Sequence, residues 1–271
     1  MAAARWDGIA LGAQASITLT GISPTEAAAI LSTVEREITR LEGIFSLYSA
    51  QSELSRLNKT GHLSQPSREL LDVLCLSRDV WSASFGVFDP SIQTIWPSPA
   101  QRVSDANMGF QNVALDSQGI TIKRAGIALT LNGIAQGFVT DRITVLLERA
   151  GFRDILVSAG ETRALGNRPS GGPWRLGISD PQGQIHETVR LKNAALATSS
   201  PWATRRIDGS AHVIDPRNDV TRPTCTTVTI QHDEAAVADA LSTAACLLSV
   251  EQTNDMLAQF PGAKEIFRLP V

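Results

Sequence analysis

Helix-like and strand-like stretches alternate along this chain from end to end, without a repeat, a low-complexity block or a long linker. Such interleaving favours a mixed domain over separate all-helical and all-strand modules. The 271 residues, 43% of them hydrophobic, can bury a substantial core as one large domain or two small ones. We therefore expect a single domain over residues 1–271, of the α+β class with a largely antiparallel sheet.

Capping residues and apolar spacing predict the helices and strands. A helix begins at about Pro24, because Ser23 provides an N-cap hydroxyl and Glu26 the matching N3 carboxylate. Between residues 174 and 230, β-prone stretches alternate with turn residues, as in an antiparallel sheet. The other expected elements are helices over residues 70–81 (ended by Gly86), 133–150 and 234–248 (N-capped by Asp233), and strands over residues 9–19, 119–124, 127–131, 155–158 and 266–269.

Charge and composition exclude several classes of protein. Lys and Arg number 24 against 27 Asp and Glu, and a net charge of −3 gives no field that attracts nucleic-acid phosphates. No apolar run approaches the roughly 20 residues that span a bilayer, and the opening residues lack a signal-peptide pattern. We expect no nucleic-acid partner and not an integral membrane protein.

Common catalytic and metal-binding motifs are also missing. The three cysteines include no C-x-x-C pair, so they cannot form a zinc cage and allow at most one disulfide. The sequence has none of the short motifs of Rossmann enzymes, P-loop NTPases, zincins or α/β-hydrolases. Any chemistry must therefore come from less common patterns.

One such pattern places three oxygen-bearing side chains on one helical face. Asp239 and Thr243 are four residues apart, with Ser242 beside them. A carboxylate and two hydroxyls are hard oxygen ligands that suit Mg²⁺. The alternative is a solvated acid next to small residues that permit close packing.

A second pattern is the strand-to-helix turn at residues 129–138, which contains Gly133 and Gln136. Helix N-termini present unpaired N–H groups, so this turn could hold a pyrophosphate; the alternative is a packing turn that binds nothing.

Further along, His212 stands before an Asp-Pro turn and could act as a general base, although a lone histidine is more often a surface or packing residue.

Two aromatic residues complete the set of candidates. Tyr48 precedes the S-E-L-S-R-L-N stretch at residues 52–58, and Trp96 follows the F-D-P-S-I stretch at residues 88–92. Their rings could enclose a planar ligand. The alternative is that both are ordinary core or surface aromatics.

Taken together and in order, these stretches resemble the ApbE family of FAD:protein FMN transferases over nearly the whole chain. The stretches that carry the resemblance are S-E-L-S-R-L-N (52–58), F-D-P-S-I (88–92), N-G-I-A-Q-G (132–137), W-R-L-G-I-S-D-P (174–181), A-L-A-T-S (195–199), H-V-I-D-P-R (212–217) and the A-D-A-L-S-T-A helix near the end. The T-L-N-G-I-A-Q-G form, with Ser158, Ala159, Gly160 and Glu161 where the wider family tends to have a Gly-Gly pair, looks closest to the NosX branch.

The resemblance implies an ApbE-like, T-fold-like flavin transferase fold and a definite activity. A Ser or Thr hydroxyl of a target protein attacks the pyrophosphate of FAD, FMN becomes esterified to the target, and AMP leaves. It also implies a role for individual positions. The positions implied are Asp239, Ser242, Thr243 and the Gly133 carbonyl for Mg²⁺; Leu11, Tyr48, Trp96, Thr130, Gln136 and Val213 for FAD; His212 for deprotonating the acceptor hydroxyl; and Asn58 in a motif that tunes transfer against hydrolysis.

Two positions depart from the family pattern. The wider family commonly has aspartate at the position of Thr130 and lysine at that of Gln136, and loss of the lysine removes a cation beside the pyrophosphate. The alternatives to transfer are a FAD pyrophosphatase that yields FMN and AMP, and a non-catalytic FAD-binding accessory protein.

The branch also implies a partner and a setting. NosX-like proteins are associated with nitrous-oxide reduction, so the expected acceptor is a flavoprotein subunit of a membrane-bound electron-transfer system, with a NosR-like FMN-binding domain. Relatives of this branch are usually exported, so the resemblance implies a periplasmic location.

Overall fold

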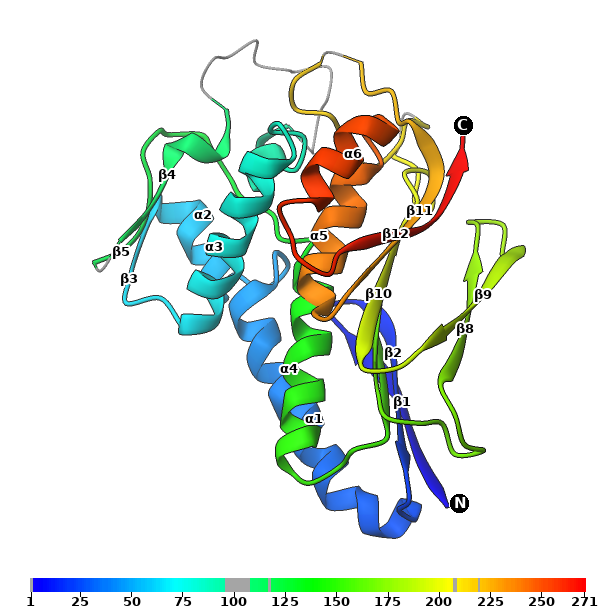
Figure 1. Ribbon diagram of the computed structural model, residues 1–271. Helices are drawn as coiled ribbons and strands as arrows, with labels where there is room; N and C mark the ends of the chain where they lie inside the picture. Colours follow the sequence, from blue (N-terminus) through cyan, green and yellow to red (C-terminus); the bar gives the residue numbers. More distant parts are fainter. Residues whose placement is uncertain (1, 96–107, 117, 207–208, 219) are drawn as a thin grey trace.

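The computed structural model describes residues 2–95, 108–116, 118–206, 209–218 and 220–271. Within these residues, a seven-stranded sheet forms the centre of the molecule, with the strand order β1-β2-β6-β7-β10-β11-β12 and antiparallel pairing throughout (Figure 1). Its strands are β1 (Ala3–Ala10), β2 (Ala13–Thr20), β6 (Ile155–Ala159), β7 (Glu161–Leu165), β10 (Ala194–Ser199), β11 (Cys225–His232) and β12 (Lys264–Pro270). The expected α+β class with a largely antiparallel sheet is confirmed.

Two smaller sheets and six helices complete the described fold. The strands β3 (His62–Ser64), β4 (Val113–Asp116) and β5 (Gly119–Ile122) form one small sheet, and β8 (Trp174–Ser179) and β9 (Ile185–Leu191) form a ribbon. The helices are α1 (Pro24–Phe45), α2 (Glu53–Thr60), α3 (Arg68–Ala83), α4 (Ala135–Arg149), α5 (Ala235–Ala245) and α6 (Val250–Leu257), with short 3₁₀ turns at Pro90–Thr94 and Phe110–Asn112.

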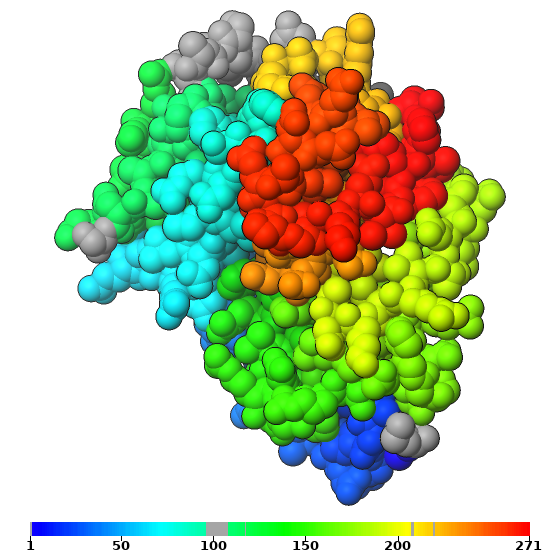
Figure 2. Space-filling model, viewed as in Figure 1, coloured from blue at the N-terminus to red at the C-terminus, as the bar shows by residue number. Residues whose placement is uncertain are grey.

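The helices α1, α4 and α5 pack on the large sheet and close its apolar face. Helix α5 is buried almost along its whole length, because it packs against α4, β10 and β11. A short helix enclosed in this way presents most of its side chains to protein rather than to water. The segments that contain α6 and β12, orange-red to red, lie next to each other on the face seen in Figure 2. No helix in the described part of the chain is both long and apolar enough to cross a membrane.

The expected helix start at Pro24 is confirmed, and the expected last helix is partly wrong. Ser23 and Glu26 form the complete capping box of α1. Helix α5 begins at Ala235 without a side-chain cap from its own N-cap residue, so Asp233 is not the cap. The helix also ends at Ala245, and a separate helix, α6, follows with its own capping box.

The single strand expected over residues 9–19 is also wrong, because the chain turns back in its middle. Leu11 and Gly12 both have positive φ, 49° and 79°, and Ala10 pairs with Ala13 across the turn. Two consecutive positive φ angles are typical of a two-residue β-hairpin turn. The result is the pair β1 and β2, and Leu11 stands at the tip of the hairpin.

The segment 127–131, expected as a strand, joins no sheet. Asn58 of α2 bonds both backbone groups of Leu129, at 2.8 Å from its Nδ2 to the carbonyl and 2.7 Å from the amide to its Oδ1. The amide of Thr130 donates to the carbonyl of Pro90 at 2.8 Å. Side chains and loops thus replace the strand neighbours that the sequence pattern suggested.

Candidate active site

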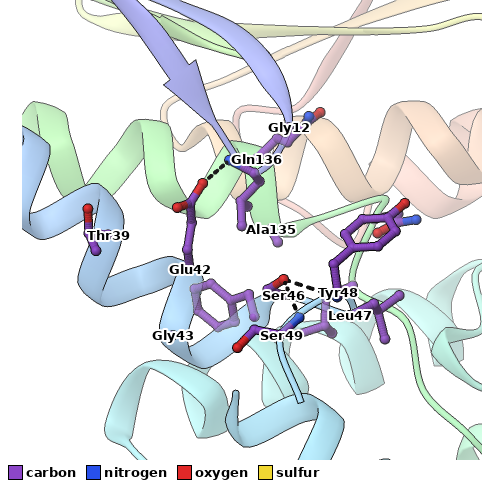
Figure 3. A pocket seen from close by; sticks show the side chains of 14 residues that line it. Gly12, Thr39, Glu42, Gly43, Ser46, Leu47, Tyr48, Ser49, Ala135 and Gln136 are labelled. Carbon is purple, nitrogen blue, oxygen red and sulfur yellow. Dashed lines mark hydrogen bonds between the residues drawn. The ribbon is translucent and has the colours of Figure 1, made fainter. Parts of the chain in front are cut away.

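Two adjoining cavities lie where the β1–β2 turn, the start of α4 and the segment after β10 meet. The first, of about 670 Å³, is bordered by the side chains of α1 and the hairpin tip shown in Figure 3. The second, of about 430 Å³, extends toward α5. Tyr48, Asn132 and Gln136 line both cavities, so the two adjoin.

The first cavity contains three of the predicted FAD positions: Leu11, Tyr48 and Gln136. The Leu11 amide donates to the Glu42 carboxylate of α1 at 2.9 Å, which holds the hairpin tip over the cavity. The Tyr48 ring is 98% exposed, although its backbone is held by the Ser46 hydroxyl, which accepts from the Tyr48 amide at 3.1 Å (Figure 3). An aromatic ring that no protein group covers is available to a ligand.

The second cavity brings together most of the other predicted residues. Those lining it are Thr130, Gly133, Gln136, His212, Val213, Asp239 and Thr243. They come from the segment before α4, from α4 itself, from the loop after β10 and from α5. With Tyr48 included, residues up to 195 positions apart in sequence (243 − 48) therefore line one cavity.

The close crossing of α4 and α5 sets the position of Asp239. The Gly137 amide of α4 donates to Asp239 Oδ2 at 3.1 Å. Asp141, one turn further along α4, accepts from the amides of Ala235 and Ala236, each at 2.9 Å, and also pairs with Arg163 of β7. A carboxylate from α4 thus caps α5 in place of a residue of its own chain segment.

Glycine at position 137 is required by this crossing, and its replacement tests the geometry. A Cβ there would lie 2.4 Å from the Ala235 carbonyl oxygen and 2.7 Å from the Ala236 Cα, both backbone atoms. We expect Gly137→Ala to destabilise the protein by about 1–3 kcal/mol in urea unfolding, the usual effect of overpacking. Gly43→Ala in α1 is the control, because nothing lies within 4 Å of its Cβ. An unchanged unfolding midpoint for Gly137→Ala would contradict the close crossing.

Two buried carboxylates line the second cavity. Asp239 of α5 is 4% exposed and Glu161 of β7 is 9% exposed. Burial, together with the smaller effect of the nearby Asp141 charge, raises the pKa of Asp239 to about 7 against the opposing Gly137 hydrogen bond. Burial and then the charge of Asp239 raise the pKa of Glu161 well above its ordinary value. Both groups resist ionisation unless a positive charge accompanies them.

Three hydroxyls form a chain beside Asp239. The Ser199 hydroxyl lies 2.7 Å from that of Ser242 and 3.4 Å from that of Thr243. Ser242 also donates to the Asp239 carbonyl at 3.0 Å and lines neither cavity, whereas Thr243 does line the second one. Thr243 also abuts Gly133, where a Cβ would lie 3.0 Å from the Thr243 Oγ1. Of the predicted metal positions, Asp239, Thr243 and Gly133 thus meet at the cavity, while Ser242 stands behind them.

The orientation of His212 is fixed by a backbone carbonyl. Its Nδ1 lies 3.0 Å from the Thr204 carbonyl, which can only accept, so Nδ1 carries the proton in the neutral ring. The Nε2 lone pair is then free, and the ring borders the second cavity. Burial lowers the pKa of His212 from its ordinary value, against the Thr204 hydrogen bond, so the ring is neutral at neutral pH.

Asn58, like Ser242, is not brought to the cavities. Asn58 lines neither, and both ends of its amide group bond Leu129, which fixes the segment leading to Thr130. Its predicted influence on catalysis stays a prediction. Trp96 lies outside the described residues.

Glu161 and Ser199 are site residues that the sequence patterns did not single out. Glu161 follows Gly160, which has a positive φ of 93° in the turn between β6 and β7. A carboxylate directly after a glycine turn at a strand end was the available signal. Ser199 ends β10 inside the A-L-A-T-S stretch and offered no comparable signal.

The lining of the second cavity is acidic. It includes Asp89, Glu161 and Asp239, and its described residues include neither Lys nor Arg. Asp89 is engaged by the amides of Ser91 and Phe110, at 2.8 and 3.2 Å. No cluster of three or more His, Cys, Asp or Glu suited to a metal occurs in the described part of the chain. Cation ligands here would have to combine carboxylates with hydroxyl and carbonyl oxygens.

Comparison with solved structures defines the class of fold. The chain superposes on a flavin transferase ApbE from Vibrio cholerae with a TM-score of 0.82, covering 98% of this chain and 97% of that one at 20% identity. An ApbE protein from Thermotoga maritima gives a TM-score of 0.80 over 96% of this chain and 92% of that one, at 24% identity. The fold is therefore that of the ApbE flavin transferases.

The sequence assigns the family directly. The profile of the ApbE family matches residues 11–267, and the chain belongs to this family. A FAD:protein FMN transferase from Chlamydia pneumoniae is 24% identical over 254 residues, 83% of this chain and 78% of that protein. One from Salmonella typhimurium is 23% identical over 282 residues, 93% of this chain and 80% of that protein.

Proposed function

We propose that this protein is a FAD:protein FMN transferase, which moves FMN from FAD to a Ser or Thr hydroxyl of a target protein and releases AMP. The observation that carries the proposal is the second cavity, where a neutral imidazole with a free Nε2 borders the same space as Asp239 and Thr243. Transfer of this kind requires a base for the hydroxyl and positive charge at the phosphates. The imidazole can serve as the base, and the oxygens of Asp239 and Thr243 can hold a cation. Membership of the ApbE family supports the same activity.

The donor set fits Mg²⁺. Asp239 supplies a carboxylate, Thr243 a hydroxyl and the neighbouring Gly133 a backbone carbonyl, all hard oxygens of the kind this ion prefers. Since the described lining of this acidic cavity has no Lys or Arg, a bound cation is needed before a pyrophosphate can enter. When bound, Mg²⁺ would neutralise the pyrophosphate and stabilise the charge that develops on it.

The remaining residues hold the ligand and move the proton. The Tyr48 ring offers stacking area to a flavin or adenine ring. His212 accepts the acceptor hydroxyl's proton at Nε2, while Thr204 keeps the ring in the required tautomer. Gln136, which lines both cavities, orients phosphate or ribose oxygens without adding charge.

The acceptor and the cellular setting are narrower proposals. The T-L-N-G-I-A-Q-G form and Gly160 preceded by Ala159 support a place in the NosX branch. On that basis we propose a periplasmic enzyme whose target is a flavoprotein subunit with a NosR-like FMN-binding domain, in electron transfer for nitrous-oxide reduction.

One assay separates transfer from the two alternatives. The protein is incubated with FAD, Mg²⁺ and an FMN-binding-domain fragment that carries the acceptor Ser or Thr, and a fragment with Ala at that position is the control. We expect a mass increase equal to FMN, less water, on the first fragment alone, with AMP released. Free FMN without labelling would indicate the pyrophosphatase, and unchanged FAD would indicate a non-catalytic FAD-binding protein.

Replacement of Tyr48 tests where the ring system of FAD binds. We expect Tyr48→Ala to weaken FAD binding about tenfold, because a stacked aromatic pair contributes up to about 1.5 kcal/mol beyond buried area. Tyr48→Phe keeps the ring and should bind nearly as wild type does. The measurement is quenching of FAD fluorescence on titration with protein. Equal quenching by Tyr48→Ala and wild type would remove Tyr48 from the binding site.

A further inference from the structure

The carboxylate of Glu161 has no part in the function proposed above, yet it lies in the same cavity. Glu161 begins β7, directly after the tight turn at Gly160, and is 9% exposed. Asp239 reaches the cavity from α5 and is 4% exposed. The strand and the helix thus each contribute one carboxylate that is more than nine-tenths buried.

Each of these carboxylates has one oxygen engaged and one free. Glu161 Oε2 accepts from the Thr198 amide at 3.2 Å, and Asp239 Oδ2 accepts from the Gly137 amide at 3.1 Å. Among the described residues, neither Glu161 Oε1 nor Asp239 Oδ1 has a hydrogen-bond partner. Two nearly buried acceptor oxygens are therefore left without a donor beside one cavity.

No protein side chain in the described lining compensates their charge. The side chain that packs over the Gly160 turn is Gln136, which is neutral; a Cβ on Gly160 would lie 2.5 Å from its amide carbon. Arg163 of β7 pairs with Asp141, which also accepts from amides of α5, and Arg163 does not line the cavity. Two like charges in a poorly solvated space repel strongly unless a cation lies between them.

We propose that Glu161 is a second carboxylate ligand of the divalent cation held by Asp239 and Thr243. This proposal rests on the proposed function, because it concerns the same cation. The Thr198 amide orients the Glu161 carboxylate, so one oxygen remains directed to the cavity. Thr198 also precedes Ser199, whose hydroxyl contacts that of Thr243. Strand β10 therefore links the Glu161 side of the site to α5.

The second carboxylate has a consequence for the order of binding. A divalent ion with one carboxylate keeps a net positive charge and depends on the pyrophosphate for much of its affinity. With two carboxylates the charge is balanced by the protein alone, and affinity rises with the number of charged ligands. The protein should therefore bind the cation before FAD arrives.

The test uses Mn²⁺ as a spectroscopic probe on the full chain, freed of metal and of FAD. Free Mn²⁺ is measured by electron paramagnetic resonance during titration of wild type, Glu161→Gln, Asp239→Asn and the control Glu187→Gln on the exposed strand β9. We expect Glu161→Gln to raise the Kd for Mn²⁺ about tenfold or more, with Glu187→Gln unchanged. Glutamine still accepts from the Thr198 amide, so a purely structural Glu161 predicts no change in Kd.

The outcomes distinguish this proposal from the one it rests on. Weakened binding in both Asp239→Asn and Glu161→Gln supports the second ligand. Weakened binding in Asp239→Asn alone overturns the role of Glu161 and leaves the proposed function standing. Wild type that binds no Mn²⁺, with or without FAD, overturns both.

A measurement on wild type covers the case in which Glu161→Gln does not fold. Infrared difference spectra are recorded on addition of Mg²⁺ to protein with ¹³C-labelled glutamate carboxyl groups. An isotope-shifted carboxylate band that changes with Mg²⁺ supports a glutamate ligand. A difference spectrum without any isotope-sensitive band overturns the proposal.

Discussion

Asparagine in place of Asp239 is expected to abolish Mg²⁺-dependent transfer while the protein remains folded. Asparagine can still accept the hydrogen bond from the Gly137 amide, which is 3.1 Å long to Asp239 Oδ2, but it brings no negative charge to the cation. The pKa of Asp239 is raised to about 7 by burial, so the aspartate weakens folding as pH rises through that value. Without metal and at pH 8, the asparagine variant should therefore be at least as stable as wild type.

Two measurements check the expectation for Asp239. Calorimetric titration with Mg²⁺ in the presence of FAD reports binding, and thermal unfolding at pH 6 and pH 8 reports stability. The control is Asp233→Asn, an exposed residue just before α5. Binding of Mg²⁺ by the Asp239 variant that equals wild type would show that the cation lies elsewhere.

Much of the fold could be predicted because its signals are local. The capping box at Ser23 and Glu26 and the apolar spacing of α1 determine that helix without help from the rest of the chain. The Asp239 and Thr243 spacing likewise follows from helix geometry alone, and the structure places both at one cavity. Patterns that involve only three or four neighbouring residues therefore predicted the local structure correctly.

The errors occur where a distant residue replaces a local signal. Asp233 looks like the cap of α5, but Asp141, 94 residues earlier than Ala235, takes that place. The segment 127–131 has a strand pattern, yet Asn58 satisfies its backbone instead of a neighbouring strand. Tertiary contacts determined the structure in both cases, and such contacts cannot be inferred from the local pattern of a single sequence.

The site residues that were missed have the same origin. Glu161 becomes important only because β7 lies beside α5, which brings it near Asp239 across 78 positions of sequence. Ser199 joins the site through hydroxyl contacts with Ser242 and Thr243 at the end of β10. Neither residue belongs to a spacing pattern, and apart from the glycine turn before Glu161 no local signal points to them.

Removal of the His212 imidazole is expected to slow transfer by roughly 10²- to 10⁴-fold, the usual contribution of a general base. A Ser or Thr hydroxyl is a weak nucleophile at neutral pH, and Nε2 is the free nitrogen because Nδ1–H donates to Thr204. Affinity for FAD should change little, since Tyr48 and the cation site hold the cofactor. Single-turnover transfer and FAD titration measure the two effects separately, with His62→Ala on the distant strand β3 as control.

The pH dependence distinguishes a base from a residue that only supports the loop. Burial lowers the pKa of His212 from 6.5, so the wild-type rate should be level near neutrality and fall as pH drops through that lowered value, where Nε2 becomes protonated. The His212→Ala variant should lack this acidic limb, because no imidazole remains to be protonated, whereas a loop-supporting role would reduce the rate equally at every pH. An alanine variant that keeps the same limb, or the wild-type rate at neutral pH, would assign the proton transfer to another group.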